Sequence, residues 1–553
     1  MSTKIIKDSI HGYITLDETF SYIIDSPEFQ RLKYIEQGSF RVLYPAARHD
    51  RFIHSLETYH LACKFAQNFI KNIQEDLEIN FEKVKNKNKI KCKIKKIQNT
   101  FYYAALLHDI GHAPFSHTTE KFFKGKTEID GSTILINKQL CDAVFSIVEV
   151  DKAERFKSEF DDCSPSPHEI MSATILINNA DNFLRDKKDD FDLELAARMV
   201  IGCTYDYNRQ EEITKEEKII LGIKNCFIRL LNSETVDVDK LDYITRDTQM
   251  SGFDNVPIDI ERLVRSVTAI RLKNKEWIYP AFRKNALSVI DNVFRAKTEQ
   301  SLWMVSHPIV VYDSELLSYC IHRLNSLLGH DYISDVFSID ALGQKGVTIN
   351  GKEYRLLNDI DISADLRTFY DKEELFKELY ERQTRRHPIW KSYYEYKYLF
   401  KSEKDTNTEE DVFVFFKGLM DYMKDSEIFV LCDESLNQIL ENHQVSQEVK
   451  DAASFLNDFC VNNKINLNFV LLPSANSFSA NFNAESVYIL FSKLPERNRK
   501  NYETYKFLKD SGSNEDKHRM FYLYSKEKFS KEQMKSFKET LINQIEQKKM
   551  PRP

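Results

Sequence analysis

The segment LLHDIGHAPFSH at residues 106–117 carries the residues in this sequence that are best suited to chemistry. Its adjacent His108 and Asp109 offer an imidazole nitrogen and a carboxylate oxygen, ligands that suit Zn, Fe or Mn and, less well, Mg. Two ligands do not hold a catalytic ion, so we expect two more from His54 in RFIHSLE and Asp239 in DVDKLDYITRD. An isolated His-Asp pair usually only ends a helix; the joint pattern predicts a metal site with positions left open for water and substrate.

Two further histidines follow the His-Asp pair. Gly111 and Pro114 should end the preceding helix and swing His112 and His117 to one side of the metal. Histidine titrates near neutral pH, so these rings are candidates for a general acid.

The helix that carries Asp239 brings other polar side chains to the same face. Asp239, Tyr243 and Asp247 are spaced at i, i+4 and i+8, which places them on one helical face. Asp242 is offset from that face. A structural salt bridge is therefore expected for Asp242 rather than a fourth carboxylate in the site.

The elements that must position these residues are mostly helical. Only 14 glycines and 13 prolines occur in 553 residues, which favours long helices over turn-rich sheets. Apolar spacing predicts helices at 28–35, 54–72, 97–110, 168–180, 191–204, 214–232, 234–249, 284–305 and over the last 20 residues. Short strand-like pieces are expected between about 335 and 365.

Beyond residue 400 the pattern changes. Short apolar runs predict strands at 412–418, 427–433, 468–473 and 487–492, separated by helices at 434–442 and 446–461. The expected fold class is therefore mainly α, with a helical core and an α+β C-terminal region.

Composition limits the binding partners, the cysteine chemistry and the cellular location expected of the chain. A formal net charge of -7 argues against non-specific electrostatic binding to nucleic acid or to an anionic membrane. Nine scattered cysteines without a Cys-x-x-Cys pair argue against a disulfide framework or zinc knuckle. The first residues lack the apolar core of a signal peptide, and no apolar run is long enough to span a membrane, so a cytoplasmic location is expected.

Taken together, four segments resemble the signatures of the HD-domain deoxynucleotide triphosphohydrolases. They are RFIHSL, LLHDIGHAPFSH, SPHE at 166–169 and DVDKLDYITRD, in the family's order. The resemblance covers roughly residues 1–320 and weakens toward 390. It implies an HD phosphohydrolase core at 36–330 after a segment at 1–35. The sequence pattern adds a helical and strand extension at 331–400 and the α+β region at 401–553.

The resemblance also implies roles for individual residues. It implies a divalent metal (Mn, Mg, Fe or Zn) on His54, His108, Asp109 and Asp239. It makes His112, His117 and His168 the catalytic histidines, with Glu120 where the family has an Asp that orients one of them. The residues matching substrate-contacting positions are Gln37, Arg51, Lys240, Tyr243, Asp247, Lys297 and His307.

The first 35 residues resemble the family's pocket for an activating nucleotide. Matching positions are Lys4, Ile5, Asp25, Gln30 and Lys33, with Lys33 replacing an arginine and losing its planar fork. The alternative interpretation is a surface helix with ordinary charge pairing. The pocket in relatives lies between subunits, so the resemblance implies a homo-oligomer, a tetramer or hexamer.

The residues that exclude ribose in a relative differ here. The positions of a Leu and a Tyr under the sugar match Gly38 and Val305, so both bulky walls are missing. Either ribonucleotides are hydrolysed too, or Phe40 or Trp303 fills the space. We expect deoxy preference to persist, since Asp247 and Tyr243 hold the other side of the sugar.

The expected activity is hydrolysis of deoxynucleoside triphosphates to deoxynucleoside and inorganic triphosphate. A role in nucleotide-pool control or antiphage defence would fit it. One alternative is an HD phosphodiesterase or nuclease on cyclic or oligomeric nucleotides, with the extra histidines holding a second metal. The other is a nucleotide sensor that binds without cutting, against which the complete ligand set argues.

Overall fold

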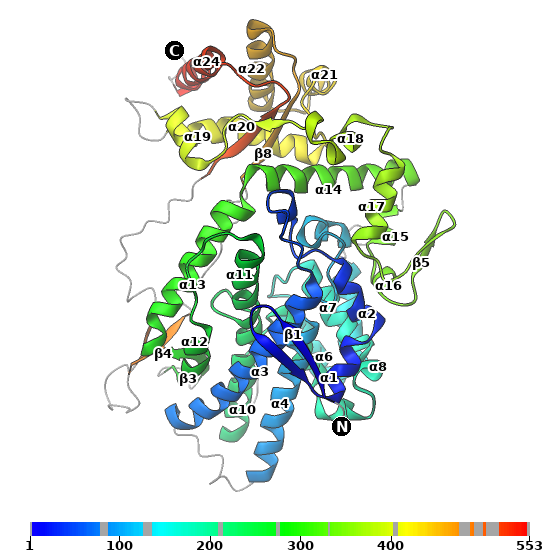
Figure 1. The fold of residues 1–553 in the computed structure, drawn as a ribbon, viewed down its shortest axis with the longest axis vertical. Coiled ribbons are helices and arrows are strands. Elements are labelled where there is room, and N and C mark those ends of the chain that lie inside the picture. Colours follow the sequence, from blue (N-terminus) through cyan, green and yellow to red (C-terminus); the bar gives the residue numbers. More distant parts are fainter. Residues whose placement is uncertain are drawn as a thin grey trace. The chain divides into compact units, whose positions relative to one another are not determined.

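The computed structural model describes residues 3–77, 87–124, 135–207, 214–272, 277–329, 332–401, 408–474, 487–491, 502–504 and 519–549. The chain divides into two compact units (Figure 1). The first comprises Met1–Thr298, Leu324–Ala364 and Asn481–Asn514, and the second Glu299–Arg323, Asp365–Ala480 and Glu515–Pro553. Among the described residues, no helix combines the length and hydropathy needed to cross a membrane.

The fold class is mainly α, as the sequence predicts. The helices of the N-terminal three hundred residues are α1 (Glu18–Ile24), α2 (Pro27–Gln30), α3 (Arg51–Asp76), α4 (Lys87–Leu107), α5 (Leu135–Phe145), α6 (Val150–Phe160), α7 (Pro167–Asn178), α8 (Ala180–Leu184), α9 (Leu193–Ile201), α10 (Lys215–Leu231), α11 (Val238–Ser251), α12 (Ile260–Ser266) and α13 (Leu287–Gln300). Short 3-10 turns follow α2 and occur at Ser39–Val42, Ser116–Thr118 and Glu120–Lys124.

The core of the first unit is built around α3, which packs against both α4 and α11 (Figure 1). Helix α3 begins because the Asp50 side chain accepts a hydrogen bond from Ile53 N at 3.0 Å. Helix α7 begins with a capping box, in which Ser166 N donates to Glu169 at 2.7 Å. It packs on α9. These caps fix where the helices that carry His54 and His168 begin.

Within its described residues, the first unit also contains three small sheets. Strands β1 (Lys4–Asp8) and β2 (Gly12–Leu16) form an antiparallel hairpin, and β5 (Val347–Ile349) pairs with β6 (Lys352–Tyr354). A four-stranded sheet has the order β10-β9-β4-β3. Its strands are β3 (Val267–Arg271), β4 (Ile278–Arg283), β9 (Tyr488–Leu490) and β10 (Tyr502–Thr504). The predicted 487–492 strand therefore exists, but it runs parallel to β4 in the first unit.

Later elements complete the chain. A π-helical turn, Ser301–Val305, follows α13, so the predicted helix 284–305 is not one regular α-helix. The remaining elements are α14 (Pro308–Leu328), α15 (Tyr332–Val336), α16 (Ile339–Leu342), α17 (Asp359–Thr368), α18 (Glu374–Tyr380), β7 (His387–Pro388), α19 (Tyr393–Phe400), α20 (Thr408–Asp425), α21 (Asp433–Glu441), α22 (Gln447–Asn463), β8 (Phe469–Pro473), β11 (Phe521–Ser525) and α24 (Lys531–Lys549).

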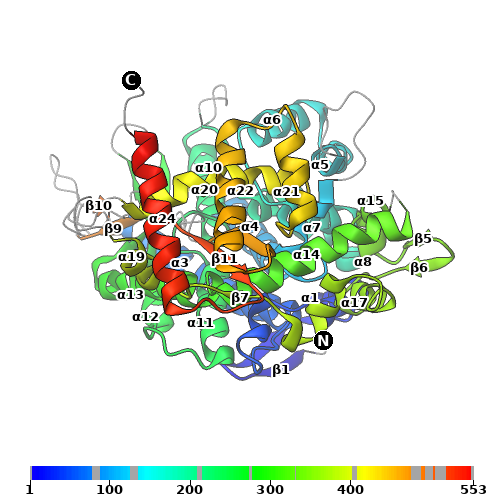
Figure 2. The ribbon, with the colours of Figure 1, turned by 90° about the horizontal axis from the view of Figure 1, so that it is seen from above.

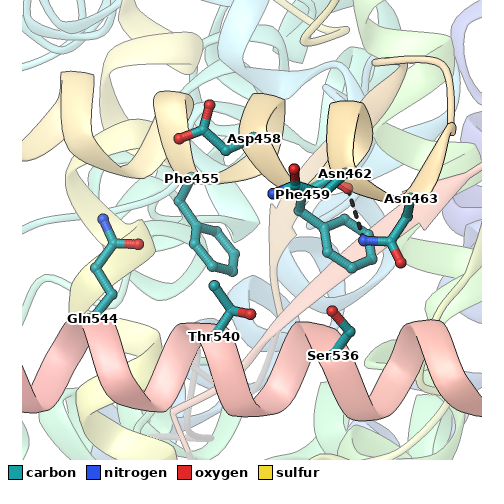
Figure 3. Close-up of a pocket in the computed structure, with 8 residues that line it drawn as sticks. All are labelled: Phe455, Asp458, Phe459, Asn462, Asn463, Ser536, Thr540 and Gln544. Carbon is teal, nitrogen blue, oxygen red and sulfur yellow. Dashed lines mark hydrogen bonds between the residues drawn. The ribbon is translucent and has the colours of Figure 1, made fainter.

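The second unit combines helices with a three-stranded sheet of order β7-β11-β8. Helices α22 and α24 lie side by side (Figure 2) and enclose a cavity of about 70 Å³ lined by Phe455, Asp458, Phe459, Asn462, Asn463, Ser536, Thr540 and Gln544 (Figure 3). Small-molecule sites usually measure about 300–1,000 Å³, so this cavity is too small for a nucleotide.

Two predicted strands in this unit are wrong. Residues 412–418 lie inside α20, whose buried side chains recur at helical spacing from Val412 through Phe416 to Met423. A short apolar run does not distinguish a buried strand from a helix, and tertiary packing decided here. Residues 427–433 form mostly loop, with one isolated bridge between Leu431 and Phe469. The strand at 468–473 and the helices at 434–442 and 446–461 are confirmed as β8, α21 and α22.

Candidate active site

The four predicted metal ligands converge in the first unit. His54 lies in the first turn of α3, His108 and Asp109 directly follow α4, and Asp239 lies in the first turn of α11. His54 Nε2 is 3.0 Å from Asp239 Oδ1, 3.4 Å from Asp109 Oδ2 and 3.2 Å from His108 Nε2. His108 Nε2 is also 3.4 Å from Asp109 Oδ1. Ligand atoms of His54, His108 and Asp239 lie within 4.8 Å of one another, and Asp109 lies beside both histidines. Two imidazole nitrogens and two carboxylates of this kind fit a divalent cation.

The electrostatics of this point also favour a cation. Burial opposes charge on His54, but hydrogen bonds to Asp239 and Asp242 raise its pKa to about 10. Burial likewise opposes charge on Asp109 and Asp239. Arg51 and the nearby histidines nevertheless hold the pKa of Asp109 well below its usual range. Hydrogen bonds with His108 and His54 do the same for the pKa of Asp239. The carboxylates are therefore ionised at neutral pH.

A second cluster lies against the first. Glu120 Oε1 is 2.6 Å from His117 Nδ1, 2.8 Å from His168 Nδ1 and 3.4 Å from His112 Nδ1. The His112 and His168 rings stack with centroids 3.9 Å apart. His112 Nε2 lies 3.2 Å from Asp109 Oδ1, so Asp109 links the two clusters. The structure brings all four predicted catalytic residues together around one carboxylate.

Their surroundings shift the pKa values of His112 and His168 in opposite directions. Burial alone would keep His168 neutral, but Glu120 raises its pKa to about 9. Burial, with Arg51 and His168 nearby, holds the pKa of His112 well below its usual range. Burial opposes charge on Glu120, but His168 and His117 hold its pKa well below the usual range. The cluster therefore contains a carboxylate and a protonated imidazole at neutral pH, as general acid catalysis needs.

The turn between the two clusters is held by residues that the sequence did not single out. The buried Arg31 donates to Ile110 O at 2.7 Å, His112 O at 3.0 Å and Leu357 O at 2.8 Å. Asp359 accepts hydrogen bonds from Phe115 N at 2.7 Å and Glu36 N at 2.9 Å.

Gly111 has a different role from the predicted helix stop. Helix α4 already ends at Leu107, and a Cβ on Gly111 would lie 2.3 Å from Ser172 N on α7. The glycine is needed because two backbones approach closely there. Beyond it, Phe115 and Ser116 have φ values of 60° and 51°, a left-handed conformation that is uncommon outside glycine.

Two predicted substrate residues, Arg51 and Gln37, lie beside the metal ligand Asp109, and Asp247 has a separate partner. Arg51 is buried and donates to Asp109 at 2.7 Å, Ser116 at 3.0 Å and the Gln37 carbonyl at 2.9 Å. Within the described residues, the buried Gln37 Oε1 accepts no hydrogen bond, which suits a ligand contact. Asp247 contacts His49 Nε2 at 2.7 Å, a partner that the sequence did not predict.

The lysines form the other part of the substrate set. Lys240 Nζ donates to Ser233 O and Asp237, each at 2.7 Å, and Lys297 donates to the Tyr243 hydroxyl. Burial and the neighbouring Lys240 lower the pKa of Lys297 to about 8. His307 belongs to the second unit, where its Nδ1 accepts from Ile309 N at 3.2 Å.

The predicted activator residues contact one another in the first unit. Lys4 pairs with Asp25, Gln30 donates to Ile24 O at 2.6 Å, and Lys33 donates to Gln30 at 2.8 Å. Ile5 is exposed. This arrangement is compatible with both ordinary charge pairing and a nucleotide pocket.

Comparisons with known proteins show what this chain resembles. The HD domain family model matches residues 51–220. The deoxynucleoside triphosphate triphosphohydrolase SAMHD1 homolog of Dictyostelium discoideum is 29% identical over 264 residues, 48% of this chain and 39% of that protein. SAMHD1 of Gallus gallus is 29% identical over 284 residues, 50% of this chain and 38% of that protein. An uncharacterised protein of Methanocaldococcus jannaschii is 28% identical over 309 residues, 56% and 47% of the two chains.

The chain spans less than half the length of these relatives. A solved structure of a hypothetical protein from Aquifex aeolicus shares the fold, with a TM-score of 0.52 at 17% identity over 98% of this chain and all of that one. The HD domain and these relatives indicate a hydrolase with a metal-binding site.

Proposed function

We propose that this chain, with its HD domain at 51–220, is a metal-dependent hydrolase that converts deoxynucleoside triphosphates to deoxynucleoside and inorganic triphosphate. The supporting observation is the shared Asp109, which lies 3.4 Å from His108 and 3.2 Å from His112. A metal-ligand set and an acid–base cluster thus meet at one carboxylate, as cleavage at a phosphorus with a poor leaving group requires. The relatives named as triphosphohydrolases support the substrate class.

A bound divalent ion would polarise a phosphate oxygen and lower the pKa of a water. His54, His108, Asp109 and Asp239 would hold it. Lys240 and Lys297 would stabilise the triphosphate charge, with Arg51 at the α-phosphate. As water adds to the α-phosphorus and the bond to the 5′-oxygen breaks, a histidine of the second cluster would protonate that oxygen. Glu120 would orient the three rings and keep His168 protonated.

A second candidate is an HD phosphodiesterase with two metals. One observation favours it: single ligand atoms of His112, His117, Glu120 and His168 all lie within 4.8 Å of one another, a spacing that suits an ion. The number of ions bound per chain separates the two proposals. A nucleotide sensor without turnover is the third candidate.

The deciding experiment is chromatography of each dNTP and NTP after incubation with the full chain and Mn or Mg, with and without a second nucleotide. We expect deoxynucleoside and triphosphate in equal amounts. Cleavage only of cyclic or oligomeric nucleotides, with two ions per chain, would favour the phosphodiesterase. Nucleotide binding without any hydrolysis product would favour the nucleotide sensor.

We further propose that a nucleotide at Lys4, Ile5, Asp25, Gln30 and Lys33 promotes activity in a homo-oligomer, a tetramer or hexamer, and that the enzyme limits deoxynucleotide pools, as in antiphage defence. Assembly and activation should then be linked. Light scattering of the chain with and without nucleotide tests this, and a monomer whose rate no second nucleotide changes would contradict it.

A further inference from the structure

A chain of buried charged groups lies behind the metal ligand His54. Its Nδ1 is 2.6 Å from Asp242 Oδ2, on the side of the ring opposite to the other metal ligands. Because Nδ1 is held there, Nε2 is directed at Asp239. Such carboxylate partners set the tautomer and orientation of a metal-binding histidine.

Asp242 is itself held by Arg246, one turn further along α11. Arg246 Nε donates to Asp242 Oδ2 at 3.1 Å, and its Nη1 contacts Asp8 Oδ1 at 3.4 Å. The same guanidinium pairs with Glu57 of α3. All four side chains are almost completely buried. Three carboxyl groups thus share one guanidinium, whose position depends on all of them.

The outer end of this chain is the turn of the N-terminal hairpin. Asp8 ends β1, and its second oxygen accepts from His11 N at 2.9 Å and from Ile10 N. His11 Nε2 lies 3.1 Å from Glu57 Oε2. Gly12 closes the turn with φ 83°, a conformation that favours glycine. Backbone N–H groups of the turn thus hold Asp8, and the His11 side chain contacts Glu57. These are the two carboxyl partners of Arg246 that lie outside α11.

This outer cluster has an alternative interpretation as a metal site. Ligand atoms of His11, Glu57 and Asp242 lie within 4.8 Å of one another. However, the Arg246 guanidinium already contacts both carboxyl groups of that set. A cation thus occupies the cluster, which favours a supporting role over a second ion.

We propose that the hairpin turn is the outer part of the metal site, with Asp8 and His11 acting as positioning residues. They hold Arg246, which holds Asp242, which in turn orients His54. Metal affinity should then depend on a turn that contributes no ligand. The inference rests on the four-residue metal site and not on the identity of the substrate.

The test is Mn²⁺ binding by the full chain, measured by electron paramagnetic resonance of the free ion. Asp8→Asn keeps the side-chain size, but its NH₂ must face either the backbone N–H groups or Arg246, so one set of contacts is lost. We expect its Kd for Mn²⁺ to rise about 10-fold, the lower end for loss of an outer partner. The matched control is Asp17→Asn, because Asp17 caps α1 in the same segment and Asn is an equally good cap; its Kd should stay that of the wild type.

The melting temperature with and without Mn²⁺ distinguishes a positioning role of Asp8 from a purely structural one. Positioning predicts that Asp8→Asn reduces the rise in Tm on adding Mn²⁺, whereas a structural role lowers both Tm values equally. Arg246→Lys keeps the positive charge but loses the planar guanidinium, so it should also raise the Kd for Mn²⁺ and reduce the rise in Tm. This variant tests the proposal if Asp8→Asn does not fold. Wild-type Kd in these variants, or an equal rise in Asp17→Asn, overturns the proposal. Absence of dNTP hydrolysis with these Kd differences intact would count only against the proposed substrate.

Discussion

The ring of Phe40 occupies the space into which a side chain on residue 38 would project. A Cβ built on Gly38 would lie 2.6 Å from Phe40 Cε2 and 3.0 Å from Cζ, and Phe40 is buried. We therefore propose that Phe40 supplies the sugar-facing wall that the resemblance leads us to expect at residue 38. Trp303, the other candidate, stacks on Tyr394 within the second unit.

This relationship predicts sugar selectivity. The wild type should prefer dGTP to GTP, and Phe40→Ala should reduce the preference by about 10²-fold, because an apolar wall rejects an added hydroxyl by that factor. Gly38→Leu should compete with the ring and add no selectivity. Values of kcat/KM for both nucleotides check this. Equal selectivity in the wild type and Phe40→Ala would show that the ring does not face the sugar.

Removing two metal ligands should abolish the site and keep the fold. In a His108→Ala, Asp109→Ala double variant we expect no bound ion and no hydrolysis, since only two of the four ligands remain. Metal analysis and circular dichroism measure both consequences. Turnover in this variant would rule out the proposed mechanism.

Substitution of His117 should affect turnover without affecting the metal. Its side chain is 65% exposed and, among the described residues, pairs with Glu120 but with none of the four metal ligands. For His117→Ala we expect kcat to fall by about 10²–10⁴-fold, the scale for loss of an acid. Loss of an ion along with activity would instead identify a ligand and favour the two-metal phosphodiesterase.

The pH dependence of kcat/KM should report Lys297. Burial and Lys240 lower its pKa to about 8, so the ammonium is charged below that pH and loses its proton above it. Because the triphosphate is an anion, kcat/KM should fall as pH rises through about 8. Lys297→Arg stays charged and should extend activity to higher pH at constant free metal. An unchanged alkaline limb in that variant would assign the limb to another group.

Gly111 should tolerate no side chain. A Cβ there would meet Ser172 N at 2.3 Å and Met171 C at 2.7 Å, both backbone atoms. Gly111→Ala should therefore destabilise the fold by about 1–3 kcal/mol, as overpacking does. Gly418→Ala in α20 is the control, because its Cβ would meet only Val449 at an ordinary 3.4 Å, and it should be neutral or stabilising. Denaturant unfolding of both variants measures the contrast.

The long helices and the candidate ligands were predictable because their signals are local. Apolar periodicity placed the helices of His54 and Asp239, and the offset of Asp242 correctly predicted its salt bridge, found with Arg246. Contacts between distant positions carry no such signal. Arg31 reaches the carbonyl of Leu357, and Asp359 holds Phe115, across more than two hundred positions. The 412–418 strand was wrong because a short apolar run suits both a buried strand and a buried helix.

The pairing of β9 with β4 has a consequence for how the protein is made. Strand β9 adds to β4 through Ala281, Phe282 and Arg283, and Leu490 and Tyr502 pack on Ile270 and Ala281. During synthesis the ribosome releases β4 long before β9, so the edge of β4 stays open while most of the second unit is produced. An open edge is a template for pairing between chains. Chains stopped before residue 487 should therefore associate and precipitate, even though they contain every proposed catalytic residue.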